Sequence, residues 1–118
     1  MSYDLAVWEG AGPGTDLKGL QLFHRLYDNF MNGGEFVLAS AQIQTFVAKL
    51  VDRWADIDAS GADDRCPWVH RPLIRNASGP LIYFAVRSSR ASEVVPYVVQ
   101  LATENGLVCF DPQIGEVR

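Results

Sequence analysis

One segment of this 118-residue chain has the side chains of a metal loop. In Asp56-Ile57-Asp58-Ala59-Ser60-Gly61, oxygen-bearing side chains alternate before a glycine, as at the start of a calcium-binding loop. Asp64 falls at the ninth position of such a loop, but Pro67 stands at the twelfth, where calcium loops place a bidentate glutamate. We therefore interpret residues 55–67 as a solvated acidic loop, with calcium as the lesser alternative, and we expect no metal and no cofactor.

Cys66, a thiol, lies near the end of this acidic loop, and His70, an imidazole, lies just after it. Such a pair can act as nucleophile and base, or supply half of a zinc site. Zinc needs four ligands, and only His24 and Cys109 remain as soft candidates. No glycine-rich turn precedes Cys66 to form an oxyanion pocket, and Cys109 stands among apolar neighbours typical of a core. We therefore expect no enzymatic activity, and leave open whether Cys66 and His70 meet in space.

The charge of the chain is acidic and unevenly distributed. It has 14 acidic and 10 basic residues, a formal net charge of -4. This balance argues against general nucleic-acid binding, which depends on lysine and arginine neutralising phosphates. No apolar run approaches the ~20 residues of a membrane-spanning helix, and no basic leader opens the chain, so we expect a cytoplasmic protein.

The positive charge is concentrated in one stretch that contains no acidic residue, 65–92. Its five basic residues are all arginines: Arg65, Arg71, Arg75, Arg87 and Arg90. Guanidinium groups suit carboxylates or phosphates, so this stretch is a candidate binding edge. The alternative is that these arginines pair with the protein's own acidic loop.

Two helices stand out among the elements that must position these side chains. From Ile43 to Trp54, apolar residues recur at i, i+3, i+4, i+7, i+8 and i+11, with Ser40 as the cap. An earlier helix carries apolar residues at three- and four-residue steps over 17–30, with Thr15 or Asp16 as its cap. The regular spacing predicts that each helix buries a single face.

The remaining patterns predict strands and one more helix. Apolar residues over 3–8, 73–74, 81–86 and 108–110 indicate strands, with residues 76–80 as the turn of a β-hairpin. A third helix, with apolar residues from Val94 to Ala102, ends at Asn105-Gly106. We therefore predict one α+β domain over residues 1–118, in the order β-α-α-β-β-α-β.

The economical packing is a single layer of about four mostly antiparallel strands with three helices on one face, because each helix has one apolar stripe. The arrangement is a ferredoxin-like variant with an additional helix in the first crossover, and its first and third strands are expected to be central and parallel. This fold hosts unrelated functions and implies none.

Three segments together resemble a known family. They are Ser2-Tyr3-Asp4-Leu5-Ala6-Val7-Trp8-Glu9-Gly10, then Gly79 to Phe84 leading into Ser88-Ser89-Arg90-Ala91, and Gly106-Leu107-Val108-Cys109-Phe110-Asp111-Pro112-Gln113. The chain is similar to uncharacterised small bacterial proteins, many of them actinobacterial, that open with a Ser-Tyr-Asp-Leu strand and end near a Phe-Asp strand. The resemblance implies an immunity partner in a toxin system and brings no catalytic residue with it.

The function we expect is therefore an immunity or antitoxin-like protein that binds and blocks a partner toxin, whose basic domain the acidic surface attracts. The expected contacts, with Trp68 as an aromatic anchor, are Asp56, Asp58, Asp63, Asp64, Trp68, Arg71 and Arg75. The alternative is a domain that binds or senses a small ligand, as a homodimer joined through its sheet.

Overall fold

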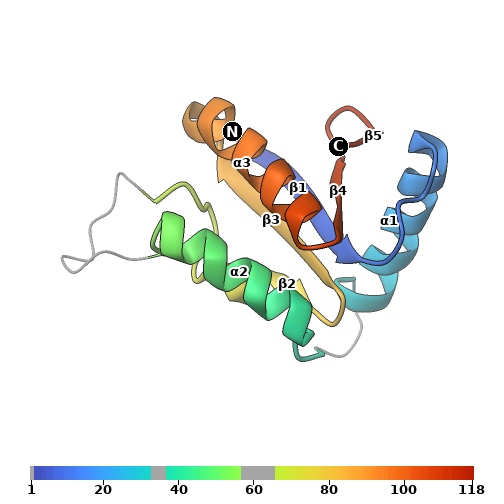
Figure 1. Ribbon diagram of the computed structural model, residues 1–118, viewed down its shortest axis with the longest axis horizontal. Helices are drawn as coiled ribbons and strands as arrows, with labels where there is room; N and C mark the ends of the chain where they lie inside the picture. Colours follow the sequence, from blue (N-terminus) through green and yellow to red (C-terminus); the bar gives the residue numbers. More distant parts are fainter. Residues whose placement is uncertain (1, 33–36, 57–65) are drawn as a thin grey trace.

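The computed structural model describes residues 2–32, 37–56 and 66–118, which form one antiparallel sheet with three α-helices (Figure 1). The strands lie in the order β2-β3-β1-β4-β5. In chain order the elements are β1 (Ser2–Glu9), α1 (Asp16–Phe30), α2 (Ala41–Arg53), the 3₁₀ helix η1 (Leu73–Asn76), β2 (Ala77–Ser78), β3 (Leu81–Arg87), the 3₁₀ helix η2 (Ser88–Arg90), α3 (Ala91–Glu104), β4 (Leu107–Asp111) and β5 (Glu116–Val117). The α+β class and the three helices are confirmed, but the sheet has five strands instead of four.

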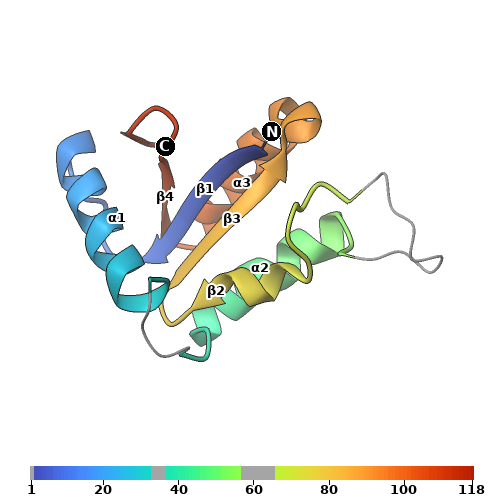
Figure 2. The same cartoon turned by 180° about the vertical axis from the view of Figure 1, so that it is seen from behind.

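The helices cover both faces of the sheet, so the prediction of three helices on one face is wrong. Leu5 and Val7 of β1 belong to the core beneath α2 and α3, whereas Ala6 and Trp8 belong to a second core beneath α1. In Figure 1, α2 and α3 lie in front of the central strands, and in Figure 2 the strands lie in front of these two helices. The physical reason is that successive strand residues point to opposite faces, so a strand apolar throughout needs cover on each.

The contact between α1 and the sheet is aromatic and close. Phe23 stacks on Phe110 and Tyr83 at ring-centroid distances of 5.4 and 5.7 Å. One turn earlier, a Cβ on Gly19 would lie 2.5 Å from Cγ2 of Val117. A glycine inside a helix costs intrinsic stability, and here it permits the close approach of α1 to β5.

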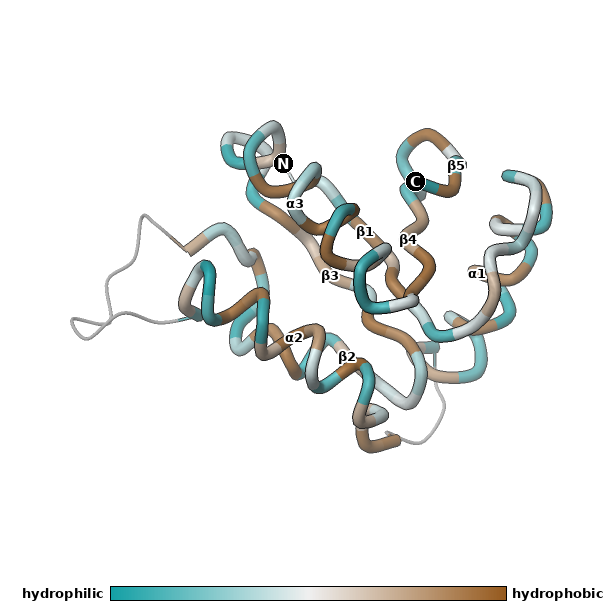
Figure 3. Tube along the Cα trace, viewed as in Figure 1, coloured by the Kyte–Doolittle hydropathy of each residue, from teal (hydrophilic) through white to brown (hydrophobic). Residues whose placement is uncertain are grey.

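The caps expected for the first two helices are confirmed, whereas α3 begins at Ala91 with no side-chain cap, so the expected cap of the third helix at Ser92 is wrong. Oγ1 of Thr15 accepts a hydrogen bond from the Lys18 N–H at 3.1 Å, and Oγ of Ser40 accepts one from the Ile43 N–H at 3.2 Å. Hydrophobic and hydrophilic segments alternate along α2 in Figure 3, as expected for an amphipathic helix. Its buried residues are Ile43, Phe46, Val47 and Leu50.

The hairpin is shorter than predicted. Residues 73–74 lie in η1 instead of a strand, and β2 forms inside the predicted turn, reversing at Gly79, which has a φ of +56°. This reversal makes β3 run antiparallel to β1, from Ser2 opposite Arg87 to Trp8 opposite Leu81. The expected parallel pairing of these two central strands is wrong, and the ferredoxin-like arrangement is not confirmed.

Candidate functional site

The acidic loop lies mostly outside the described residues. Asp58, Asp63 and Asp64, three of the expected partner contacts, fall there, and so does the calcium interpretation. Asp56 is described, and its Oδ1 accepts a hydrogen bond from the backbone N–H of Leu73 at 2.8 Å. This bond links the chain just after α2 to the start of η1, so Asp56 has a structural role.

Trp68, the expected aromatic anchor, is fully buried. Its indole Nε1 donates a hydrogen bond to the carbonyl oxygen of Trp54 at 3.0 Å, and its ring meets those of Trp54 and Phe84 edge to face. A β-bridge from Trp68 to Val86 extends the sheet at this point and draws the indole into the core. The prediction that Trp68 is a surface anchor is therefore wrong.

The aromatic residue nearer the surface is Trp54, which sequence reasoning assigned to the buried stripe of the second helix. It is half-buried, and its ring lies 5.0 Å from that of Tyr97, edge to face. The guanidinium of Arg53 lies 5.0 Å from the Trp54 ring centroid and 5.9 Å from that of Tyr97. The position of Trp54 in the sequence could have indicated this exposure, because Trp54 is the last residue of the apolar stripe and lies just beyond the end of α2.

The two arginines expected at the binding edge, Arg71 and Arg75, are exposed. Nη1 of Arg71 lies 3.5 Å from the carbonyl oxygen of Asp56, at the limit of a hydrogen bond. Arg75 forms no ion pair or hydrogen bond through its side chain with any residue that the structure describes. Arg90 instead pairs with Glu93 at 3.2 Å. The alternative, in which the arginines pair with the acidic loop, falls mostly outside the described residues.

The thiols belong to the core. Cys66 is buried, with Sγ 3.8 Å from the carbonyl oxygen of Trp68, whereas His70 is an exposed residue. Cys109 is also buried, as predicted, and burial raises the pKa of its thiol to about 12. The Cys109 thiol therefore stays protonated at neutral pH, which makes it a poor nucleophile.

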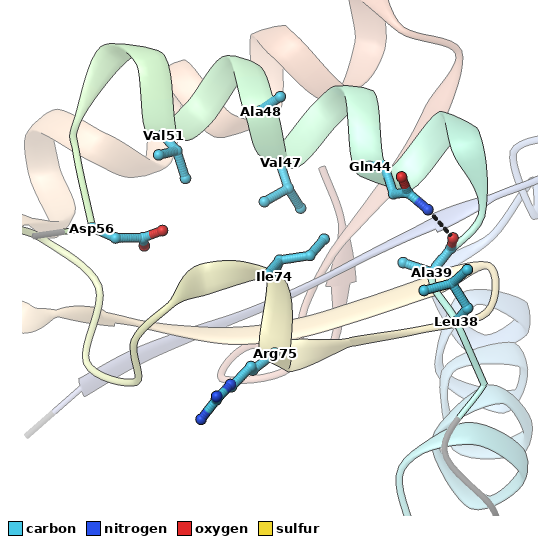
Figure 4. Close-up of a pocket in the computed structure, with 9 residues that line it drawn as sticks. All are labelled: Leu38, Ala39, Gln44, Val47, Ala48, Val51, Asp56, Ile74 and Arg75. Carbon is cyan, nitrogen blue, oxygen red and sulfur yellow. Dashed lines mark hydrogen bonds between the residues drawn. The ribbon is translucent and has the colours of Figure 1, made fainter.

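An open groove lies between α2, η1 and the residues that precede α2 (Figure 4). Its volume is about 580 Å³, and its lining is mostly apolar. The residues that line it are Leu38, Ala39, Gln44, Val47, Ala48, Val51, Asp56, Ile74 and Arg75. Leu38 is 76% exposed and Ile74 38% exposed, so two large apolar side chains of the lining are in contact with solvent.

The groove arises because the apolar stripe of α2 is wider than the surface it packs against. Ile43, Phe46 and Leu50 are fully buried, while Val51, one position beyond, is half-buried and faces η1 across the groove. Sequence reasoning missed this site, since its walls come from separate segments and Ile74 was assigned to a strand. A signal was present in the breadth of the stripe, which includes adjacent apolar pairs such as Val47 beside Phe46.

Polar groups lie at the margins of the groove. The amide Nε2 of Gln44 donates a hydrogen bond to the carbonyl oxygen of Ala39 at 2.7 Å and occupies one end (Figure 4). Asp56 occupies the other end, and Arg75 lies on the η1 side. An apolar floor with a few polar groups at its edge is the composition of a binding site.

A second, smaller hollow of about 220 Å³ lies beside the first turns of α3. Next to it, the buried carboxylate of Asp111 accepts hydrogen bonds from the hydroxyl of Tyr3, from Nη1 of Arg118 at 2.9 Å and from Nε2 of Gln113 at 2.6 Å. The bond to Asp111, and then burial, raise the pKa of the Tyr3 hydroxyl. Because this carboxylate is satisfied within the chain, the groove beside α2 is the stronger candidate site.

Among the described residues there is no group of three or more histidine, cysteine, aspartate or glutamate side chains placed to hold a metal ion, and no helix suited to crossing a membrane. The groove is thus the feature from which a function can be argued. Comparisons with protein-family models, with curated proteins and with solved structures gave no match to this chain.

Proposed function

We propose that this protein is a non-enzymatic binding protein that holds a partner protein in the groove beside α2, as an immunity or antitoxin-like protein that blocks a toxin would. The observation that carries the proposal is the open apolar groove, with the exposed side chains of Leu38 and Ile74 in its lining. Covering such side chains removes apolar surface from water, at about 25 cal/mol per Å². Exposed apolar patches on folded proteins commonly mark interaction sites.

The openness of the groove favours a protein partner over a small ligand. Small-molecule sites bury about 70–90% of their ligand. Here Leu38, Gln44, Ala48, Ile74 and Arg75 are all exposed, so the groove covers one side of an occupant only. A partner protein can cover the other side with its own structure.

A small apolar ligand is the second candidate. The volume of about 580 Å³ supports it, since it falls in the range of about 300–1,000 Å³ typical of ligand pockets. A homodimer joined through an open sheet face is not proposed, since helices pack on each face of the sheet.

Net charge supports a basic partner. The chain carries a formal charge of -4, and a charged surface attracts the opposite charge and raises the association rate. The proposed toxin is therefore a protein with a basic binding domain, and association should slow as ionic strength rises.

The test is site-specific photo-crosslinking in the native host. A photoreactive residue replaces Thr45, an exposed residue of α2 one turn before Ala48 at the groove. The matched control replaces Gln21, an exposed residue of α1, which packs on the opposite face of the sheet. We expect one protein to be captured from position 45 and not from position 21, and excess unmodified protein to compete with the capture.

A growth assay then tests the immunity role. Expression of the captured protein alone should arrest growth, and co-expression of this chain should restore it. Capture of the same proteins from both positions, or of none, contradicts the proposed site. Capture of a harmless protein keeps the binding function and rejects the toxin-blocking role.

A further inference from the structure

The length of the groove restricts what can occupy it. Its α2 wall extends from Gln44 to Val51, which corresponds to about 10 Å at the helical rise of 1.5 Å per residue. That length is about two turns of a helix. An occupant that is itself a helix would therefore place two or three apolar side chains, at i, i+3 or i+4, and i+7, against the groove.

An extended segment finds little to bind there. β2, the edge strand beside the groove, has two residues, and the chain that precedes α2 already bonds to the turn after it. The N–H of Gly79 donates to the carbonyl oxygen of Val37 at 3.1 Å, and the N–H of Ser40 donates to the carbonyl oxygen of Gly79 at 2.9 Å. A helix forms its own backbone hydrogen bonds and has no need of a free edge.

The two charged residues of the groove, Asp56 and Arg75, differ in whether their side chains already have hydrogen-bond partners. Asp56 already accepts a hydrogen bond from the Leu73 N–H. Arg75 is exposed and has no side-chain partner in the described part of the chain. Guanidinium groups pair well with carboxylates, often through two parallel hydrogen bonds. The side chain of Arg75 points away from α2 at the η1 margin of the groove (Figure 4), where it can pair with an acidic side chain at that edge of an occupant.

From these observations we infer that the groove binds a two-turn amphipathic helix of the partner protein, with its apolar face on Val47, Val51 and Ile74 and one Asp or Glu paired with Arg75. The inference rests on the proposed function and names the part of the partner that is recognised. The inference is compatible with a partner whose surface is basic overall, because only one carboxylate is required, opposite Arg75.

The test uses a phage-displayed library of helical 14-residue peptides, selected on the purified full chain. Peptides that also bind Ala48→Arg are removed, since the added side chain fills the groove. The selected peptides should share apolar residues at i, i+3 or i+4, and i+7, and carry Asp or Glu beside that face. Enrichment of peptides without this spacing, or of none, overturns the inference.

A charge exchange tests the pairing itself. An enriched peptide should bind Arg75→Glu roughly tenfold more weakly, about 1.4 kcal/mol, and replacing its acidic residue by lysine should restore the affinity for that variant. Equal affinity of the peptide for both forms of the protein overturns the pairing. Capture of a partner from position 45 without a helical consensus would reject this inference alone, whereas absence of capture would reject the proposed function.

Discussion

The indole Nε1 of Trp68 donates a hydrogen bond to the backbone carbonyl oxygen of Trp54, the residue just beyond the end of α2, at 3.0 Å. This bond joins the end of the helix to the segment that returns from the acidic loop to the sheet. Asp56 adds a second link, to the backbone of Leu73 in η1. Two hydrogen bonds therefore hold the end of α2 to the segments that follow it, and the second one comes from Asp56, a residue that lines the groove.

Trp68→Phe removes the donor and leaves a void in the core. We expect a loss of about 2–4 kcal/mol in the free energy of unfolding, measured by urea denaturation. Trp54→Phe is the control, since it keeps the backbone acceptor and changes a half-buried ring, and should cost about 1 kcal/mol. Equal losses in the two variants would show that the hydrogen bond is unimportant.

Asp56→Ala removes the acceptor for the Leu73 N–H. The expected cost is about 1–2 kcal/mol, with a lower thermal midpoint. Asp56→Asn keeps an acceptor oxygen at the same place and should lose less than half as much. If Asp56→Asn is as unstable as Asp56→Ala, then the negative charge and not the hydrogen bond is what matters.

Gly19→Ala should destabilise the protein, although alanine is the better helix former by about 1 kcal/mol. The new Cβ would lie 2.5 Å from Cγ2 of Val117, and such overpacking costs about 1–3 kcal/mol. Gly12→Ala, where a Cβ meets nothing within 4 Å, is the control and should be close to neutral. Adding Val117→Ala to Gly19→Ala should recover part of the lost stability. If it does not, the strain in Gly19→Ala does not come from contact with Val117.

Because the hydroxyl of Tyr83 is partly buried and hydrogen-bonded, we expect the free energy of unfolding to fall in alkali. Burial, and then its hydrogen bond to Oδ2 of Asp4 at 2.8 Å, raise its pKa above the ordinary 10.0. The folded state thus favours the neutral phenol, so this contribution is complete below pH 10 and is lost as the pH rises from there towards the folded pKa. Tyr83→Phe should flatten the fall in unfolding free energy above about pH 10, measured by urea denaturation at each pH. Parallel curves for the two proteins would contradict the assignment.

The local patterns of the sequence predicted the helices well. The caps at Thr15 and Ser40 and the apolar spacing of α2 depend on neighbours three or four residues apart, which a sequence displays directly. The placement of α1 depends on which face of β1 it covers. The apolar run from Leu5 to Trp8 indicates only that both faces of this strand are apolar. Strand direction was missed because it depends on the short β2 and the reversal at Gly79.

The candidate site was harder to predict than the fold. Of the expected contacts, Arg75 lines the groove, Asp56 lies at its end, and Trp68 is buried in the core. Composition indicated a charged surface, whereas the groove is mostly apolar. Its walls bring Val47 and Ile74 together across a gap of more than twenty positions in the chain, a relationship that no local spacing contains.

The most direct test of the account is the dissociation constant of the partner captured from position 45, measured by calorimetry with two matched variants. Ala48→Arg fills the groove at an exposed helix position, and Gln21→Arg adds the same charge at an exposed position on α1. We predict that Ala48→Arg weakens binding about 100-fold, roughly 2.7 kcal/mol, while Gln21→Arg binds as the parent does and both variants keep its thermal midpoint. Undiminished binding by Ala48→Arg, or an equal loss in both variants, would contradict the groove as the binding surface.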